Sequence, residues 1–171
     1  MQTPVSGPTP GPSGPTNAPS GLPPTIDAMT GAFDPEMAIR IMSRHGHGGF
    51  IGLTYHAHGD DCVEIALPWR ADLVGDETSG VLASGPIISL LDNATSLSVW
   101  TRRKRFVPQA TLDLRIDYLR AATPGETVIA HADCYAIKRS MSFVRAIAHQ
   151  GDPSNPVAHA AGIFMRTAWP S

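Results

Sequence analysis

The segment PIISLLDNATSLSVWTRR, residues 86–103, decides the fold of this chain. Its apolar residues cover nearly the whole circumference of a helix, which is the pattern of a helix buried on all sides. They are Ile87, Ile88, Leu90, Leu91, Ala94, Leu97, Val99 and Trp100. Gly85-Pro86 marks the start, because the residue before a proline is pushed out of the helical region while proline is tolerated in the first turn. We therefore expect one long, buried helix.

The chain after this helix reads as strand. Residues 111–118 alternate strictly, which predicts Leu112, Leu114, Ile116 and Tyr118 on one face of a strand and Thr111, Asp113, Arg115 and Asp117 on the other. Turn sequences at 123–126, 138–140 and 151–156 separate three further strands, at 127–137, 141–149 and 157–168. Short connections between them favour an antiparallel meander.

Before the helix, Asp34-Pro35 predicts the capped start of a shorter helix that ends at Gly46, Gly48 and Gly49. Residues 51–58 and 62–69, joined by Gly-Asp-Asp, read as a β-hairpin, and residues 70–80 as a loop. One buried helix with five or six antiparallel strands fits an α+β hotdog fold, in which a curled sheet wraps one central helix. The unpaired sheet edges predict a homodimer.

Length and composition favour one domain, predicted at residues 28–171, after a disordered Pro/Gly-rich tail at 1–27. The net charge of -2 argues against binding to nucleic acid or anionic membranes. Cys62 and Cys134 lack metal-ligand spacing and read as free thiols in a reducing compartment. With no long apolar run or secretory signal, a soluble, cytoplasmic protein is expected.

A narrow polar stripe interrupts the apolar helix. Ser89, Asp92 and Ser96 follow at offsets of three and four and share a face with Gly85. An aspartate on a helix is usually solvated, but a carboxylate in a largely apolar helix needs a partner or has its pKa raised, and both conditions are typical of functional acids. Asp92 is therefore the candidate chemical centre.

The start of this helix offers a second candidate feature. The unpaired amides there carry partial positive charge, and Pro86 lacks one, so Ser84 and Gly85, with Ile87 behind, are the candidate donors to an oxyanion. An ordinary helix cap explains Gly85-Pro86 equally well. Gly85 and Asp92 are seven residues apart, roughly 10 Å along the axis. One helix can hardly place both the amide donors and the acid within reach of the same carbonyl group. Two antiparallel helices of a dimer would therefore form the site.

Residues 81–96 and 110–125 together resemble the hotdog acyl-CoA thioesterases of the phenylacetate-degradation (PaaI-like) type. The resemblance covers roughly residue 50 to the C-terminus. It implies that Asp92 is the catalytic carboxylate, acting as general base or nucleophile, that Ser84 or Gly85 is the oxyanion donor, and that Ser96 and Thr111 orient water or the acid. Ala83-Ser84-Gly85 departs from the commonest His-Gly-Gly motif of that family.

Coenzyme A carries phosphates, which require local cations. Residues 102–105, RRKR, end the predicted helix, and their positive charges are explained more simply by the partial negative charge of a helix C-terminus than by substrate binding. The resemblance places the turn of Lys138, Arg139 and Ser140 near the pantetheine channel, so these are the expected substrate contacts. His45, His47, His56 and His58 lack convincing partners for zinc, so no metal is expected, nor any cofactor.

The sequence thus predicts acyl-CoA hydrolysis by a homodimer, with assembly into a homotetramer left open. A non-catalytic acyl-CoA binding or sensing module is the alternative, and the missing histidine favours it. A hotdog hydratase would need a histidine paired with the acid, and no histidine lies between His58 and His131.

Overall fold

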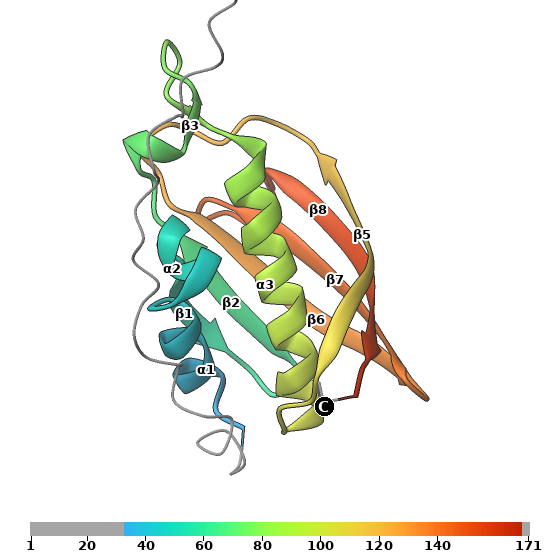
Figure 1. Cartoon of the computed structure of the whole chain (residues 1–171). Helices are drawn as coiled ribbons and strands as arrows, with labels where there is room; N and C mark the ends of the chain where they lie inside the picture. The colour runs from blue at the N-terminus through green and yellow to red at the C-terminus, as the bar shows by residue number, and fades with distance from the viewer. Residues whose placement is uncertain (1–32, 169–171) are drawn as a thin grey trace, which may run out of the picture.

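The computed structural model describes residues 33–168, which form a curled antiparallel sheet with one long helix across its concave face (Figure 1). That helix, α3 (Ser84–Arg103), begins two residues earlier than the sequence indicated. The α+β hotdog architecture is confirmed. The tail predicted at residues 1–27 lies outside the described residues, as do both ends of the domain predicted at 28–171.

The elements follow one another along the chain with short connections. They are α1 (Pro35–Met42), α2 (Gly46–Ile51), β1 (Thr54–His58), β2 (Cys62–Leu67), a 3-10 turn (Ala71–Leu73), β3 (Val74–Asp76), β4 (Val81–Leu82), α3, β5 (Gln109–Tyr118), β6 (Val128–Lys138), β7 (Met141–His149) and β8 (Ala158–Arg166). The main sheet has the order β1-β2-β6-β7-β8-β5, and β3, which lies within the stretch expected as a loop, pairs separately with β4. Within residues 33–168, no helix combines the length and hydropathy that a bilayer span requires.

The N-terminal segment confirms one prediction and corrects another. Asp34 caps α1 through hydrogen bonds from the amides of Glu36 and Met37 to its side chain. The glycines that were expected to end the helix instead form the second helix, α2, and the strand begins only at Thr54. Burial explains the difference: Ile51 lies in the core, and packing overrides the low helix propensity of glycine.

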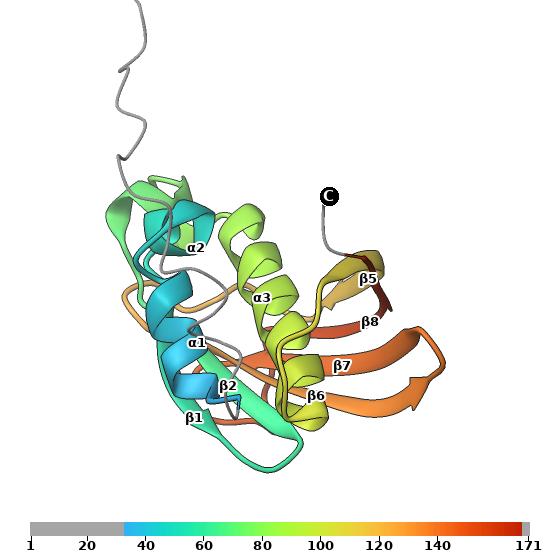
Figure 2. The ribbon, with the colours of Figure 1, turned by 60° about the horizontal axis from the view of Figure 1, so that its bottom comes forward.

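The core lies between α3 and the sheet. Leu90, Leu91, Ala94 and Leu97 are fully buried there, and α3 packs mainly on β2, β6 and β7. Figure 2 shows α3 resting on the sheet with α1 and α2 beside it. The predicted all-round burial holds for the second half of α3. The first half keeps an open face, on which Ile88 is 43% exposed.

The path of β5 differs from the predicted meander. Strands β6, β7 and β8 are consecutive neighbours, but β5 crosses over and pairs with β8 at the edge of the sheet (Figure 1). This crossing brings β5 alongside the open face of α3. It also leaves one edge of β5 without a strand partner in the described part of the chain.

A β-bulge in β5 changes which side chains face the helix. Thr111 pairs with Phe164 and Asp113 with Ile163, so Leu112 is the extra residue. Leu114 and Ile116 contact the core as predicted, but Leu112 does not and is 54% exposed. Strict alternation assigned Thr111 to the opposite face, and the bulge is the reason that this assignment is wrong.

Candidate active site

The polar stripe of α3 faces the edge strand β5 rather than the core between the helix and the centre of the sheet. Ser89, Asp92 and Ser96 are half-buried on this face, and Gly85 is exposed at its start. Since Leu91 and Ala94 turn into the core, the helix holds Asp92 at a fixed place on the boundary between core and surface. This position gives the acid an apolar support and an open approach.

Asp92 has a defined partner. The hydroxyl of Thr111, on β5, donates a hydrogen bond of 2.9 Å to Oδ1 of Asp92. A carboxylate held by a donor on one oxygen keeps the other oxygen free and has one preferred orientation. The structure thus brings together two of the residues that the sequence selected.

Strand β5 contacts the same helix at two further levels. Gln109 donates to both the carbonyl and the hydroxyl oxygen of Ser96, each at 2.9 Å. The hydroxyl of Tyr118 donates to the carbonyl of Ser84 at 3.1 Å, and burial raises the pKa of this tyrosine. Ser96 is therefore bound to Gln109, and within residues 33–168 its side chain makes no hydrogen bond to Asp92. Neither Gln109 nor Tyr118 was selected from the sequence, because the crossing of β5 is not visible there.

The first turn of α3 presents free amides. Ala83 is the N-cap, and its own amide donates to the carbonyl of Leu73 at 2.9 Å. No described side chain caps the helix, and Pro86 has no amide hydrogen. The amides of Ser84 and Gly85 are thus the available donors of this turn, as predicted. A methyl group built on Gly85 meets nothing within 4 Å, so the space beside it is open.

A histidine that the sequence analysis considered only as a zinc ligand lies beside this stripe. Nε2 of His47, on α2, is 2.9 Å from the hydroxyl of Ser89, which itself donates to the carbonyl of Gly85 at 3.0 Å. The expectation that no histidine accompanies the segment around Asp92 was drawn from nearby positions in the sequence, and α2 supplies one from outside them. Its hydrogen bond is to Ser89 rather than to the acid.

The predicted substrate contacts lie at the other end of α3. Lys138 and Arg139 are exposed at the turn between β6 and β7, and Arg139 has a positive φ of 54°. Ser140 lines a surface pocket beside Arg105 and Arg166. The structure does not place these three residues next to Asp92, which lies near the middle of the helix.

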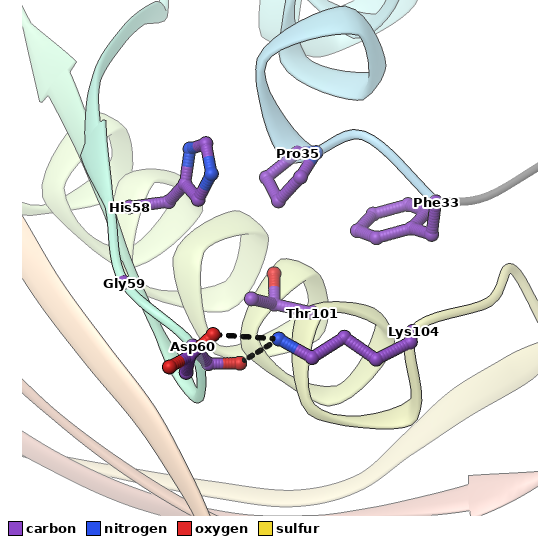
Figure 3. Close-up of a pocket in the computed structure, with 7 residues that line it drawn as sticks. All are labelled: Phe33, Pro35, His58, Gly59, Asp60, Thr101 and Lys104. Carbon is purple, nitrogen blue, oxygen red and sulfur yellow. Dashed lines mark hydrogen bonds and ion pairs between the residues drawn. The ribbon is translucent and has the colours of Figure 1, made fainter.

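A separate cavity of about 360 Å³ lies near the C-terminal end of α3 (Figure 3). It is lined by Phe33, Pro35, His58, Gly59, Asp60, Thr101 and Lys104. The ammonium of Lys104 points to Asp60 and binds both its backbone carbonyl and its carboxylate. Because this cation is neutralised within the chain and no predicted site residue lines the cavity, it is distinct from the candidate site.

Comparison with known proteins decides the family. Residues 79–157 match the family model of the thioesterase superfamily. A protein of Pseudomonas aeruginosa with a crystal structure is 34% identical, and the match covers 78% of this chain and 100% of that one, with a TM-score of 0.70. The chain belongs to the thioesterase superfamily.

Other solved structures agree with this assignment. A mutant of the phenylacetic acid degradation protein PaaI of Thermus thermophilus is 26% identical over 70% of this chain and 96% of that one, with a TM-score of 0.60. A thioesterase of Haemophilus influenzae, 16% identical over 84% and 96% of the two chains, shares the fold with a TM-score of 0.71. No curated protein matches significantly. The chain is thus a PaaI-like, hotdog-fold thioesterase, for which hydrolysis of acyl thioesters is the supported general activity.

Proposed function

We propose that this thioesterase hydrolyses acyl-CoA, with Asp92 as its catalytic acid–base or nucleophilic group. The observation that carries the proposal is the hydrogen bond from Thr111 to Asp92 on the open face of α3. It orients a carboxylate on a surface that a substrate can reach. Family membership supports the reaction class, and this geometry supports Asp92 as the reacting residue.

The chemistry requires few groups. The amides of Ser84 and Gly85 stabilise negative charge on the thioester oxygen as the carbonyl carbon becomes tetrahedral. Asp92 takes a proton from water while the water oxygen bonds to that carbon. The carbon–sulfur bond then breaks, and the sulfur leaves as a thiolate that recovers the proton. In the nucleophilic route the Asp92 carboxylate bonds to the carbonyl carbon, and the carbon–sulfur bond breaks to release the thiolate. Water then hydrolyses the resulting mixed anhydride, which restores the carboxylate and supplies the proton that the thiolate takes up.

Two subunits would complete each site. The seven residues from Gly85 to Asp92 span roughly 10 Å of helix, too far for one carbonyl to contact both. An antiparallel second copy would place its amides beside this Asp92. The open edge of β5 and the exposed side chains of Leu112 and Leu119 support a dimer in which this edge is covered.

Thr111 would orient the acid through its hydrogen bond, and Ser96 would help to orient the water. Cys62 and Cys134 are free thiols, which fits the cytoplasm that we propose as the compartment. The competing function is acyl-CoA binding without turnover. It is favoured by Ala83, which stands where the commonest family motif has histidine.

The test replaces Asp92 with Asn and measures release of free CoA from short, medium, long and aryl acyl-CoA thioesters. We expect kcat to fall about 100-fold or more, since general acid–base groups typically contribute that much. Asp117→Asn, a carboxylate on β5 paired with Arg115, is the matched control and should keep full activity. Unchanged CoA release by the Asp92 variant defeats the proposal. Tight binding of acyl-CoA without turnover by the unaltered protein establishes the alternative.

A further inference from the structure

An open pocket of about 420 Å³ lies between the segment that follows α3, the turn between β6 and β7, and the end of β8. It is lined by Arg105, Val107, Pro108, Ser140, Arg166, Thr167 and Ala168. Backbone hydrogen bonds hold its walls together, from Arg166 to Ser140 at 2.8 Å and from Thr167 to Pro108 at 2.9 Å. Its position is therefore set by the sheet rather than by a free loop.

The charges of this pocket are not balanced by the chain. Within residues 33–168, neither the side chain of Arg105 nor that of Arg166 makes an ion pair or a hydrogen bond. The neighbouring cations differ: Arg102 pairs with Asp61 at 3.3 Å and Lys104 with Asp60. Two guanidinium groups that share a pocket without an acid repel each other, and an anion between them would remove the repulsion.

A third arginine lies behind these two. Arg103 donates to the hydroxyl of Ser142 at 3.2 Å, while its buried Nε has no partner in the described structure. Burial lowers the pKa of Arg103, and the positive charges of Arg105 and Arg166 lower it further, against the opposing effect of Cys134. The three guanidinium groups therefore form one cationic cluster.

We infer that this pocket, through Arg105 and Arg166 with Ser140, binds phosphate groups at the nucleotide end of the thioester substrate. Guanidinium forks and hydroxyls suit phosphate oxygens in both charge and geometry. The helix runs eleven residues from Asp92 to Arg103, roughly 16 Å. That separation suits a substrate whose reacting bond and phosphates are joined by a long arm. The inference rests on the proposed function, since acyl-CoA is such a substrate.

The inference also revises the predicted contacts. Ser140 lines the pocket, whereas Lys138 and Arg139 do not. Arg105 and Arg166 come from different segments of the chain, one after α3 and the other at the end of β8. In the sequence, Arg105 belongs to the basic run at residues 102–105, which was interpreted as complementing the helix C-terminus. Nothing in the sequence connected Arg105 with Arg166.

The decisive experiment compares one acyl group carried by CoA and by pantetheine, which lacks the nucleotide phosphates. In the double variant Arg105→Gln/Arg166→Gln, KM for the CoA thioester should rise at least about tenfold with little change in kcat. The kinetics with the pantetheine thioester should not change. Arg115→Gln, an exposed arginine paired with Asp117, is the control. The inference is wrong if the double variant loses as much activity with the pantetheine thioester as with the CoA thioester. It is also wrong if KM for the CoA thioester does not change.

A binding measurement separates this inference from the proposed hydrolysis. Adenosine 3',5'-bisphosphate, the nucleotide end of CoA, should bind the unaltered protein by calorimetry and bind the double variant at least about tenfold more weakly. That loss supports the pocket even where the Asp92→Asn assay refutes the chemistry. Equal binding to both proteins, with hydrolysis intact, rejects the pocket and leaves the proposed function standing. Circular dichroism checks that both proteins are folded.

Discussion

Thr111 Oγ1 lies 2.9 Å from Asp92 Oδ1, so the edge strand of the sheet holds the only acid of the central helix. The two residues are nineteen positions apart in the sequence and reach each other because β5 crosses to the edge beside α3. The orientation of the proposed catalytic acid therefore depends on the position of β5.

Replacing Thr111 with Val should lower kcat about tenfold while KM for acyl-CoA changes little. Valine keeps the shape but removes the donor, so the carboxylate loses its fixed orientation; a hydrogen bond to a charged group contributes on this order. Thr111→Ser should retain most activity because it keeps the hydroxyl. Steady-state CoA release measures the effect, with Thr54→Val on β1 as a control. Equal activity of the Val and Ser variants would show that the hydrogen bond has no catalytic role.

Replacing Gly85 with Ala should leave the fold intact but reduce activity. The added methyl meets nothing within 4 Å in the chain, and alanine favours the helix more than glycine does. It would, however, occupy the space from which a carbonyl approaches the free amides. We expect an unchanged or slightly higher melting temperature together with a lower kcat/KM. A fully active variant would exclude this amide as an oxyanion donor.

Mixing the two kinds of variant tests whether sites are shared between subunits. In heterodimers of Asp92→Asn with Gly85→Ala, one of the two shared sites would have both its acid and its amides unaltered. Activity should then return to about half that of the unaltered dimer, whereas sites contained within one subunit would give no recovery. Co-expression with two affinity tags isolates the heterodimer for the assay. This outcome follows from the antiparallel arrangement of two helices.

Local sequence patterns predicted the helices and strands whose formation depends on nearby residues. The long helix α3, the Asp34 cap and the antiparallel strands follow from residue spacing, and the structure confirms them. The contacts around Asp92 could not be predicted in the same way. The bulge at Leu112 shifts the alternation of β5, and α2 brings His47 to Ser89 from 42 positions away. Both depend on tertiary packing, which periodicity does not report.

Replacing Gly162 with Ala should destabilise the protein and weaken the site together. An added methyl would lie 2.6 Å from the carbonyl oxygen of Asp113, beside the bulge of β5. Overpacking of this kind costs typically about 1–3 kcal/mol, measurable by urea unfolding. The bulge also sets the position of Thr111, so kcat should fall with stability. Gly85→Ala is the matched control, because it adds the same group in open space. An unchanged free energy of unfolding would show that β5 and β8 move apart enough to accept the methyl group without destabilising the protein.

The buried imidazole of His149 should make stability depend on pH. Burial lowers its pKa from the ordinary value of 6.5; His131 and His56 lower it further, while Glu64 and Asp152 oppose this. Nδ1 accepts a hydrogen bond from the amide of Gly151 at 3.2 Å, and Nε2 is buried without a partner. Protonation of Nδ1 would convert this acceptor into a second donor and break the bond to Gly151. The folded state therefore favours the neutral ring.

The sign of the effect follows from linkage. Below pH 6.5 the unfolded chain binds a proton at His149 more readily than the folded chain does, so the free energy of unfolding falls as pH decreases toward the folded pKa. Above pH 6.5 this contribution is constant. His149→Asn keeps an acceptor for Gly151 but does not titrate, so its stability should fall less steeply over the same window. Urea unfolding of both proteins from about pH 5 to 8 measures the difference. Parallel curves would show that His149 titrates equally in the folded and unfolded chains.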